Sequence, residues 1–159
     1  MTHIRIVNAG MFGLLLLAAG NASCSSTGSS AGPEPRTVGV VVDGASKALG
    51  ATLGFYMASS DTTTVSGANG AGYPAISLRF PGNKTGTFTC SVTKTGIDYT
   101  PVFGTTYIAG AGGDCTITVT SYGAVGESIA GTFSGTVKSG ANSVTLTEGG
   151  FNVIRQKGL

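Results

Sequence analysis

The sequence predicts an all-β protein, and three observations lead to that class. Apolar and polar residues alternate over many short segments, which is the pattern of strands buried on one face. Turn signals separate these segments, helped by 27 Gly among 159 residues. No segment has a convincing helical period. We therefore expect an antiparallel β-sandwich, or a closed barrel-like sheet, of roughly eight to ten short strands.

The chain begins its β region with three segments of different character. Residues 38–42 are an apolar, β-branched run and predict the first strand. Residues 46–49 are short and stand before Gly50, so we expect a loop or a single helical turn. Residues 51–58 carry apolar side chains at every second position, which predicts a second strand. An amphipathic helix is the alternative there, and Gly50 and Gly54 count against it.

Further strands are expected along the rest of the chain. Residues 62–65 and 75–80 predict two of them, followed by a turn over 81–86. Three final strands are expected at residues 128–138, 143–147 and 151–155. The connections between these three, at 139–142 and 148–150, have hairpin length and contain the glycines that such turns favour.

Two predicted strands carry the cysteines of the domain. Residues 87–93 place Phe88, Cys90 and Val92 on one face, and residues 115–120 place Cys115 on an apolar face in the same way. A disulfide between Cys90 and Cys115 is the expected outcome, and closing the loop should contribute on the order of 3 kcal/mol. Two buried free thiols are the alternative, which an oxidising compartment disfavours.

Three segments of the C-terminal half form a moderately specific pattern: GDCTITVTSY at residues 113–122, IAGTFSGT at 129–136 and VTLTEGGFNV at 144–153. The pattern, which covers about residues 86–155, resembles an uncharacterised β domain of bacterial surface lipoproteins. The resemblance implies an all-β sandwich that is exported as a lipoprotein. It implies no known activity and no site residues.

The first 23 residues have the composition of a signal peptide. Arg5 precedes an apolar run at residues 11–19, which is shorter than the about 20 residues that a membrane-spanning helix needs. Residues 17–24, LAAGNASC, resemble the lipobox of bacterial lipoproteins, with Asn21 where an aliphatic residue is usual. The resemblance implies cleavage before Cys24 and lipidation of that residue. Ordinary cleavage after Ala22, which would release a soluble protein, is the alternative.

Cysteine counting favours the lipid anchor. Three cysteines leave one odd thiol in a secreted chain, and a lipid on Cys24 leaves Cys90 and Cys115 as a pair. Residues 24–36 then have the composition of a flexible tether, and residues 37–159 form the β domain. Ser25 after the cysteine resembles the outer-membrane sorting pattern. We expect an outer-membrane or cell-surface location.

Charge excludes some classes of partner. Charged residues make up 10% of the chain. Nine Lys and Arg, less Arg5 of the leader, leave eight against seven acidic residues, a net charge of +1. So small a charge disfavours nucleic acid and anionic membrane surfaces as partners.

The side chains do not predict catalysis. His3, the single histidine, lies in the leader, so Ser-His-Asp and Cys-His mechanisms and histidine-based zinc sites are not expected. A carboxylate-based glycosidase remains an option, because it needs only two positioned acids. The acids, however, fall at expected turns and strand ends, where solvated roles are the norm. No cofactor or metal is expected, although a structural Ca²⁺ is left open.

Two binding hypotheses remain. Four tyrosines lie in or beside expected loops and could stack on sugar rings: Tyr73, Tyr99, Tyr107 and Tyr122. Tyrosine also commonly buries its ring and leaves its hydroxyl in water. A ladder of outward threonines could form an ice-binding face, but Thr is simply a good strand residue as well. The expected function is a non-catalytic structural or binding role at the cell envelope, with a glycan or an envelope protein as partner.

Overall fold

A computed structural model describes residues 36–110 and 114–158. Eleven strands and no helix occupy these residues, so the all-β prediction is confirmed. The strands are β1 (Thr37–Val42), β2 (Ala45–Leu49), β3 (Ala51–Met57), β4 (Thr62–Ala68), β5 (Ala75–Pro81), β6 (Gly86–Thr89), β7 (Gly96–Val102), β8 (Thr105–Ala109), β9 (Cys115–Tyr122), β10 (Ser128–Ser139) and β11 (Asn142–Gln156). No helix that could cross a membrane is found in this part of the chain. The expected leader, Cys24 and the tether up to residue 35 lie outside the described residues.

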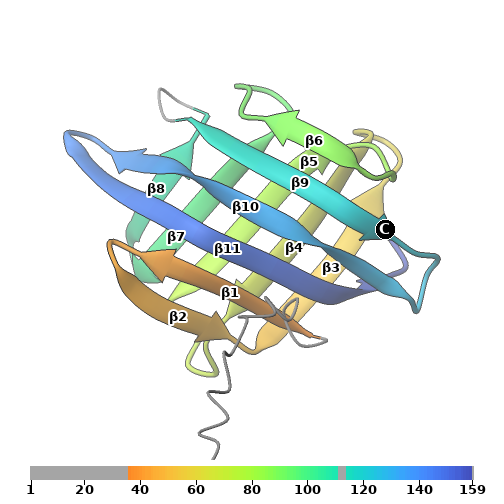
Figure 1. The fold of residues 1–159 in the computed structure, drawn as a ribbon, viewed down its shortest axis with the longest axis horizontal. Coiled ribbons are helices and arrows are strands. Elements are labelled where there is room, and N and C mark those ends of the chain that lie inside the picture. The colour runs from red at the N-terminus through yellow and green to blue at the C-terminus, as the bar shows by residue number, and fades with distance from the viewer. Residues whose placement is uncertain (1–35, 111–113, 159) are drawn as a thin grey trace, which may run out of the picture. The chain divides into compact units, whose positions relative to one another are not determined.

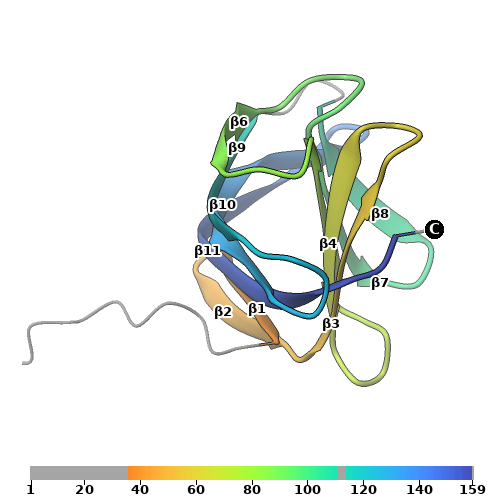
Figure 2. The ribbon, with the colours of Figure 1, turned by 90° about the vertical axis from the view of Figure 1, so that its right-hand side faces the viewer.

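The strands form one mostly antiparallel sheet, and Figure 1 shows that it curves back so that two of its sides, here called the first and the second layer, face each other. The first layer has the order β2–β1–β11–β10–β9–β6, and it crosses in front of the second layer in Figure 1. The second layer has the order β3–β4–β5–β7–β8. Figure 2 shows the two layers from the side. They are joined at two corners, because the end of β11 pairs with β3 in parallel and the end of β10 pairs with β8.

The core fills the space between the layers. It is built from the inward positions of the alternating strands, and its largest members that are almost fully buried are Phe80, Phe151, Leu49, Ile76, Leu78, Ile97, Ile117, Ile129 and Leu146. Two phenylalanines pack over glycines of the neighbouring strand. A Cβ on Gly131 would meet the backbone oxygen of Thr118 and lie 2.7 Å from Cζ of Phe151. One on Gly149 would meet the backbone oxygen of Phe133 and lie 2.6 Å from Cδ2 of the same residue. The glycines at these positions therefore make room for the rings.

The corner between β11 and β3 depends on another glycine. Gly54 faces inward, and a Cβ there would lie 2.6 Å from Cγ2 of Val153 and 3.3 Å from Cδ1 of Ile129. Both neighbours are side-chain atoms of the core. Side chains alternate in direction along a strand. Because Gly54 faces inward, the alternating residues Leu53, Phe55 and Met57 lie on the outer face.

We expect Gly54→Ala to lower the free energy of unfolding by about 1–3 kcal/mol through overpacking. The double variant Gly54→Ala with Val153→Ala removes the methyl group that the new Cβ would meet. Its loss should therefore be smaller than the sum of the two single losses by about 0.5–3 kcal/mol. Urea unfolding measures all three values. Gly50→Ala is the matched control, because a Cβ at Gly50 would meet nothing within 4 Å; additive effects in the cycle would contradict the contact.

Some strand predictions were wrong. Residues 46–49 form neither a loop nor a helical turn but lie in the edge strand β2, which pairs with β1 over its whole length. The strand predicted at 87–93 ends at Thr89, and Val92 is 87% exposed in the following turn instead of facing the core. The predicted count of eight to ten short strands is too low, and β10 and β11, with 12 and 15 residues, are not short.

The expected turn at residues 148–150 is a β-bulge within one continuous strand. The pairing of β10 with β11 shifts between Phe133 and Gly135, opposite Thr147 and Glu148. Glu148 has a φ of 50°, which bends the strand without ending it. The expected strands 143–147 and 151–155 are therefore two halves of β11.

Candidate binding face

The outer face of the second layer brings polar and small side chains together. Along β4, β5 and β7, outward residues alternate with buried ones such as Val65, Leu78 and Ile97. The strand register then sets the outward residues in rows across the sheet. Ser66 lies opposite Ser77, and Ser77 lies opposite Asp98.

A shallow depression, the outer trough, lies on this face. It has a volume of about 200 Å³ and is lined by Ser66, Gly67, Ala68, Ala75, Ile76, Ser77, Asp98 and Thr100. Its floor is low because two pairs of small outward residues are adjacent: Ser66 with Ser77, and Ala68 with Ala75. Leu53, which is 44% exposed, lies opposite Ser66 on the β3 side. Larger side chains on the neighbouring strands thus border a floor of small ones.

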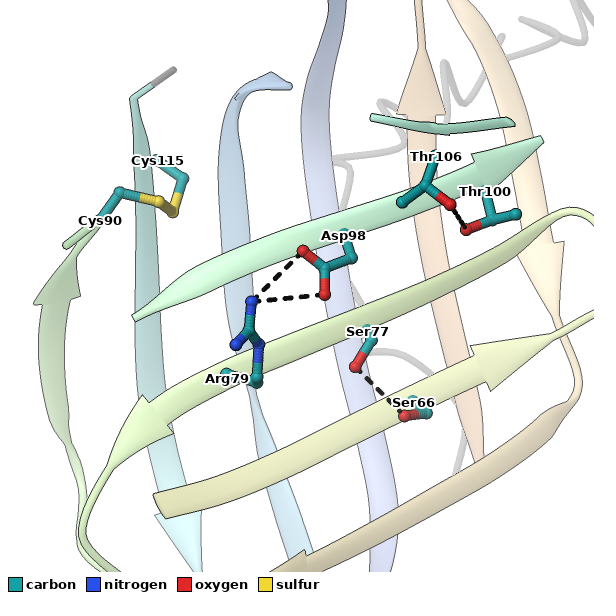
Figure 3. Close-up of polar contacts among 8 residues, drawn as sticks. All are labelled: Ser66, Ser77, Arg79, Cys90, Asp98, Thr100, Thr106 and Cys115. Carbon is teal, nitrogen blue, oxygen red and sulfur yellow. Dashed lines mark hydrogen bonds and ion pairs between the residues drawn. A yellow bond between two sulfur atoms is a disulfide. The ribbon is translucent and has the colours of Figure 1, made fainter. Parts of the chain in front are cut away.

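The polar groups around the outer trough form hydrogen bonds and an ion pair with one another, as Figure 3 shows. Arg79 Nη2 lies 3.4 Å from both carboxylate oxygens of Asp98. Ser66 Oγ donates to Ser77 Oγ at 3.4 Å, and the hydroxyls of Thr100 and Thr106 are 3.1 Å apart. A surface ion pair of this kind contributes only about 0–1 kcal/mol to stability. Its effect here is to leave the face polar but electrically neutral.

Two exposed aromatic rings lie beyond one end of the outer trough. Tyr73 lies in the loop between β4 and β5, and Phe103 lies in the turn between β7 and β8. Their ring centroids are 6.2 Å apart with an edge-to-face angle of 73°. Phe103 is 85% exposed and Tyr73 is 36% exposed. The two loops meet because Ala75 pairs with Thr100 at this end of the β5–β7 ladder.

Sequence reasoning singled out Tyr73 but missed Phe103 and the outer trough. An apolar pair, Val102 and Phe103, directly before Gly104 was the available signal for an exposed turn. The trough could not be found in this way, because its members come from three strands whose register is fixed by the folded sheet.

The other three tyrosines that were considered for sugar binding lie in strands and take part in packing. Tyr99 in β7 is 4% exposed, and its ring centroid lies 6.5 Å from that of Tyr107 in β8. Tyr122, at the end of β9, places its hydroxyl 2.7 Å from Thr63 Oγ1. The guanidinium carbon of Arg155 lies 5.0 Å from the centre of the Tyr122 ring. The four tyrosines are therefore distributed over different contacts and do not form one aromatic surface.

Tyr99 makes the stability of the domain depend on alkaline pH. Burial, with smaller effects from Asp43 and Tyr107, raises the pKa of Tyr99 above its ordinary value of 10.0. The folded state holds this proton more tightly than the unfolded chain, so the contribution is full below about pH 10 and is lost as pH rises through the folded pKa. Between about pH 9 and about pH 11, the melting temperature of Tyr99→Phe should fall less than that of the wild type.

Circular dichroism melting curves measure this difference. Tyr73→Phe is the control, because Tyr73 is an exposed tyrosine outside the core. Equal alkaline losses of melting temperature in the wild type and in Tyr99→Phe would contradict the assignment.

Cys90 and Cys115 form a disulfide, as predicted, with Cα atoms 5.0 Å apart. It links the residue after β6 to the first residue of β9 and reinforces the backbone hydrogen bond from Cys90 N to Cys115 O. A pocket of about 330 Å³ lies beside it, lined by Thr89, Cys90, Asp114, Cys115, Thr116, Ser134 and Gly135. Although larger than the outer trough, it has no aromatic ring or cationic side chain in its lining, and it borders residues 111–113, which are not described.

The outer face of the first layer carries threonines in register. Thr87 lies opposite Thr118, which lies opposite Thr132, and a second row contains Thr89, Thr116 and Ser134. The hydroxyls of Thr87 and Thr118 are 3.2 Å apart. Bulges in the β9–β10 and β10–β11 pairings flank these rows and increase the local twist. The rows therefore do not extend into the flat lattice that ice binding would need.

Taken together, the architecture defines an all-β, disulfide-linked domain with a neutral polar face and an exposed aromatic pair. Among the described residues, no group of three or more His, Cys, Asp or Glu side chains could hold a metal ion. No family model, curated protein or solved structure matches this chain. The resemblance to surface-lipoprotein domains consequently stays a prediction from the sequence.

Proposed function

We propose that this protein is exported, anchored to the membrane by lipid on Cys24, and has a non-catalytic structural or binding role at the cell envelope. The observation that carries the proposal is the disulfide between Cys90 and Cys115. Disulfides form and persist in oxidising compartments, which supports export. The disulfide also uses two of the three cysteines, so Cys24, directly after the leader-like segment, is the odd one.

The outer trough supports a role in binding more than in catalysis. Its one carboxylate, Asp98, has both oxygens 3.4 Å from Arg79 Nη2 and is therefore already engaged in an ion pair. A glycosidase would need a second acid across the site, and the lining of the outer trough includes only this one. The proposed partners are the membrane, through Cys24, and a glycan or an envelope protein at the surface.

A soluble secreted carbohydrate-binding or adhesive domain is the second candidate. Two observations favour it: Asn21 stands where a lipobox usually has an aliphatic residue, which favours ordinary cleavage after Ala22, and the aromatic pair of Tyr73 and Phe103 is exposed. The two candidates share the binding face and differ in the anchor. They are therefore separated by the state of the N-terminus.

Intact mass spectrometry tests the anchor. The protein is purified from its native bacterium or a comparable one, and its mass is measured with and without reductant. We expect a chain beginning at Cys24 that carries a diacylglycerol or triacyl group and gains about two mass units on reduction, as one disulfide requires. A lipid-free chain beginning at Ser23 would overturn the anchored form and favour the secreted one.

A further inference from the structure

The most exposed large hydrophobic side chains in the described residues include Phe103, at 85%, and Val102, at 57%. Val102 is the last residue of β7, and Phe103 follows it in the β7–β8 turn beside Tyr73. A phenylalanine that is almost fully exposed contributes little to the hydrophobic core. An exposed apolar patch beside polar groups is typical of a binding site.

The aromatic pair lies close along the chain to the outer trough. Ala75, two residues after Tyr73, lines the trough, and so does Thr100, three residues before Phe103. The trough follows β5 from Ala75 to Ser77, about 7 Å at about 3.4 Å per residue, and the aromatic pair lies beyond its Ala75 end. The trough and the pair together are therefore longer than a single sugar ring and suit a chain ligand.

The chemistry of this surface matches a neutral saccharide. Sugar rings present C–H groups that stack on aromatic faces, and their hydroxyls both donate and accept hydrogen bonds. The rings of Tyr73 and Phe103 offer the first contact. The hydroxyls of Ser66, Ser77 and Thr100, with the carboxylate and guanidinium of the Arg79–Asp98 pair, offer the second. Because that pair is neutral overall, the surface favours no charged ligand.

We propose that the outer trough and the Tyr73–Phe103 pair together bind a neutral polysaccharide chain. The inference rests on the proposed binding role and adds its site and ligand class. The aromatic pair stacks on one sugar unit, and the trough holds the following unit against its floor of Ser66, Ala68, Ala75 and Ser77. A bilayer would use the apolar turn but not the polar trough, so the trough favours the saccharide.

Affinity electrophoresis of the full chain, purified from whichever fraction holds it, tests the proposal. Native gels contain xylan, galactomannan, α-mannan or mixed-linkage β-glucan. We expect at least one polysaccharide to retard the wild type, and Phe103→Ala to bind it about five- to tenfold more weakly. Ala75→Trp, which fills the trough from an outward position, should abolish the retardation.

Two matched controls separate the site from general effects. Val92→Ala removes an equally exposed side chain from another turn, at 87%. Thr118→Trp places the same bulky ring on the outer face of the first layer. Both variants should be retarded like the wild type, and circular dichroism should show that every variant is folded.

The proposal is overturned if none of the four polysaccharides retards the wild type, or if Phe103→Ala and Ala75→Trp bind as well as the wild type does. Co-sedimentation with phosphatidylcholine vesicles that depends on Phe103, without polysaccharide binding, would overturn it in favour of a membrane contact. The mass measurement is independent of these outcomes. A lipid-free protein that binds polysaccharide would refute only the anchor, and a lipidated one that binds none would refute only this site.

Discussion

Replacing Phe151 by alanine should lower the free energy of unfolding by about 3–5 kcal/mol, the usual cost of removing a buried phenylalanine. The side chain is 0% exposed and its ring lies over Gly131 of the neighbouring strand. Loss of the ring leaves a cavity that the glycine cannot fill. Urea unfolding followed by circular dichroism measures the change.

Phe103→Ala is the matched control for this prediction. The same group is removed there from a position that is 85% exposed, so the free energy of unfolding should hardly change. Similar losses in the two variants would show that Phe151 is not held in the core as described.

Removing the disulfide should have the next largest effect. The double variant Cys90→Ala with Cys115→Ala is expected to lose about 3 kcal/mol, because the loop between the two residues is no longer closed in the unfolded chain. Replacing both residues avoids a free thiol that could pair with Cys24. The urea midpoint should fall accordingly.

Reduction provides the control for the disulfide. A reductant should lower the midpoint of the wild type to near that of the double variant, and it should leave the double variant unchanged. Equal stability of the wild type and the double variant would mean that the disulfide between Cys90 and Cys115 does not constrain the unfolded chain.

The strands that were predicted best carry clear alternation. β5 and β9 place every second residue in the core, and both were predicted from that pattern. β2 was missed because its sequence, ASKAL, is short, stands before Gly50 and has no alternation of apolar and polar residues; four of its five residues are exposed. It forms a strand because it pairs with the free edge of β1. This pairing depends on the tertiary structure and cannot be predicted from the local sequence alone.

The hairpin of β7 and β8 was not predicted, and it contains Pro101. Proline within a run counts against a strand, yet here it lies where the pairing with β8 shifts, between Tyr99 and Val102. The tyrosines at 99 and 107 were expected in or beside loops, although they lie within strands and face the core. Such an irregularity becomes visible only when both strands are present.

The candidate site could be predicted only in part. Tyr73 was singled out because its residue type suits sugar stacking, and the pairing of Cys90 with Cys115 followed from the faces of their strands. The outer trough depends on which small residues stand side by side across β4 and β5. A shift of one residue in that register would turn Ser66 and Ala68 inward, so the site exists only with the complete sheet.

The position of β11 in the chain affects the order in which the domain can fold. β11 follows every strand with which it pairs. One of these strands is β1, whose Thr37 pairs with Asn152, more than a hundred residues later in the chain. The two layers cannot be joined at the β3 corner until residues 142–156 are present. Contacts this distant in sequence form slowly. We expect such a chain to remain open while it is being made, and the proposed export would need an unfolded chain that a narrow translocation pore can accept.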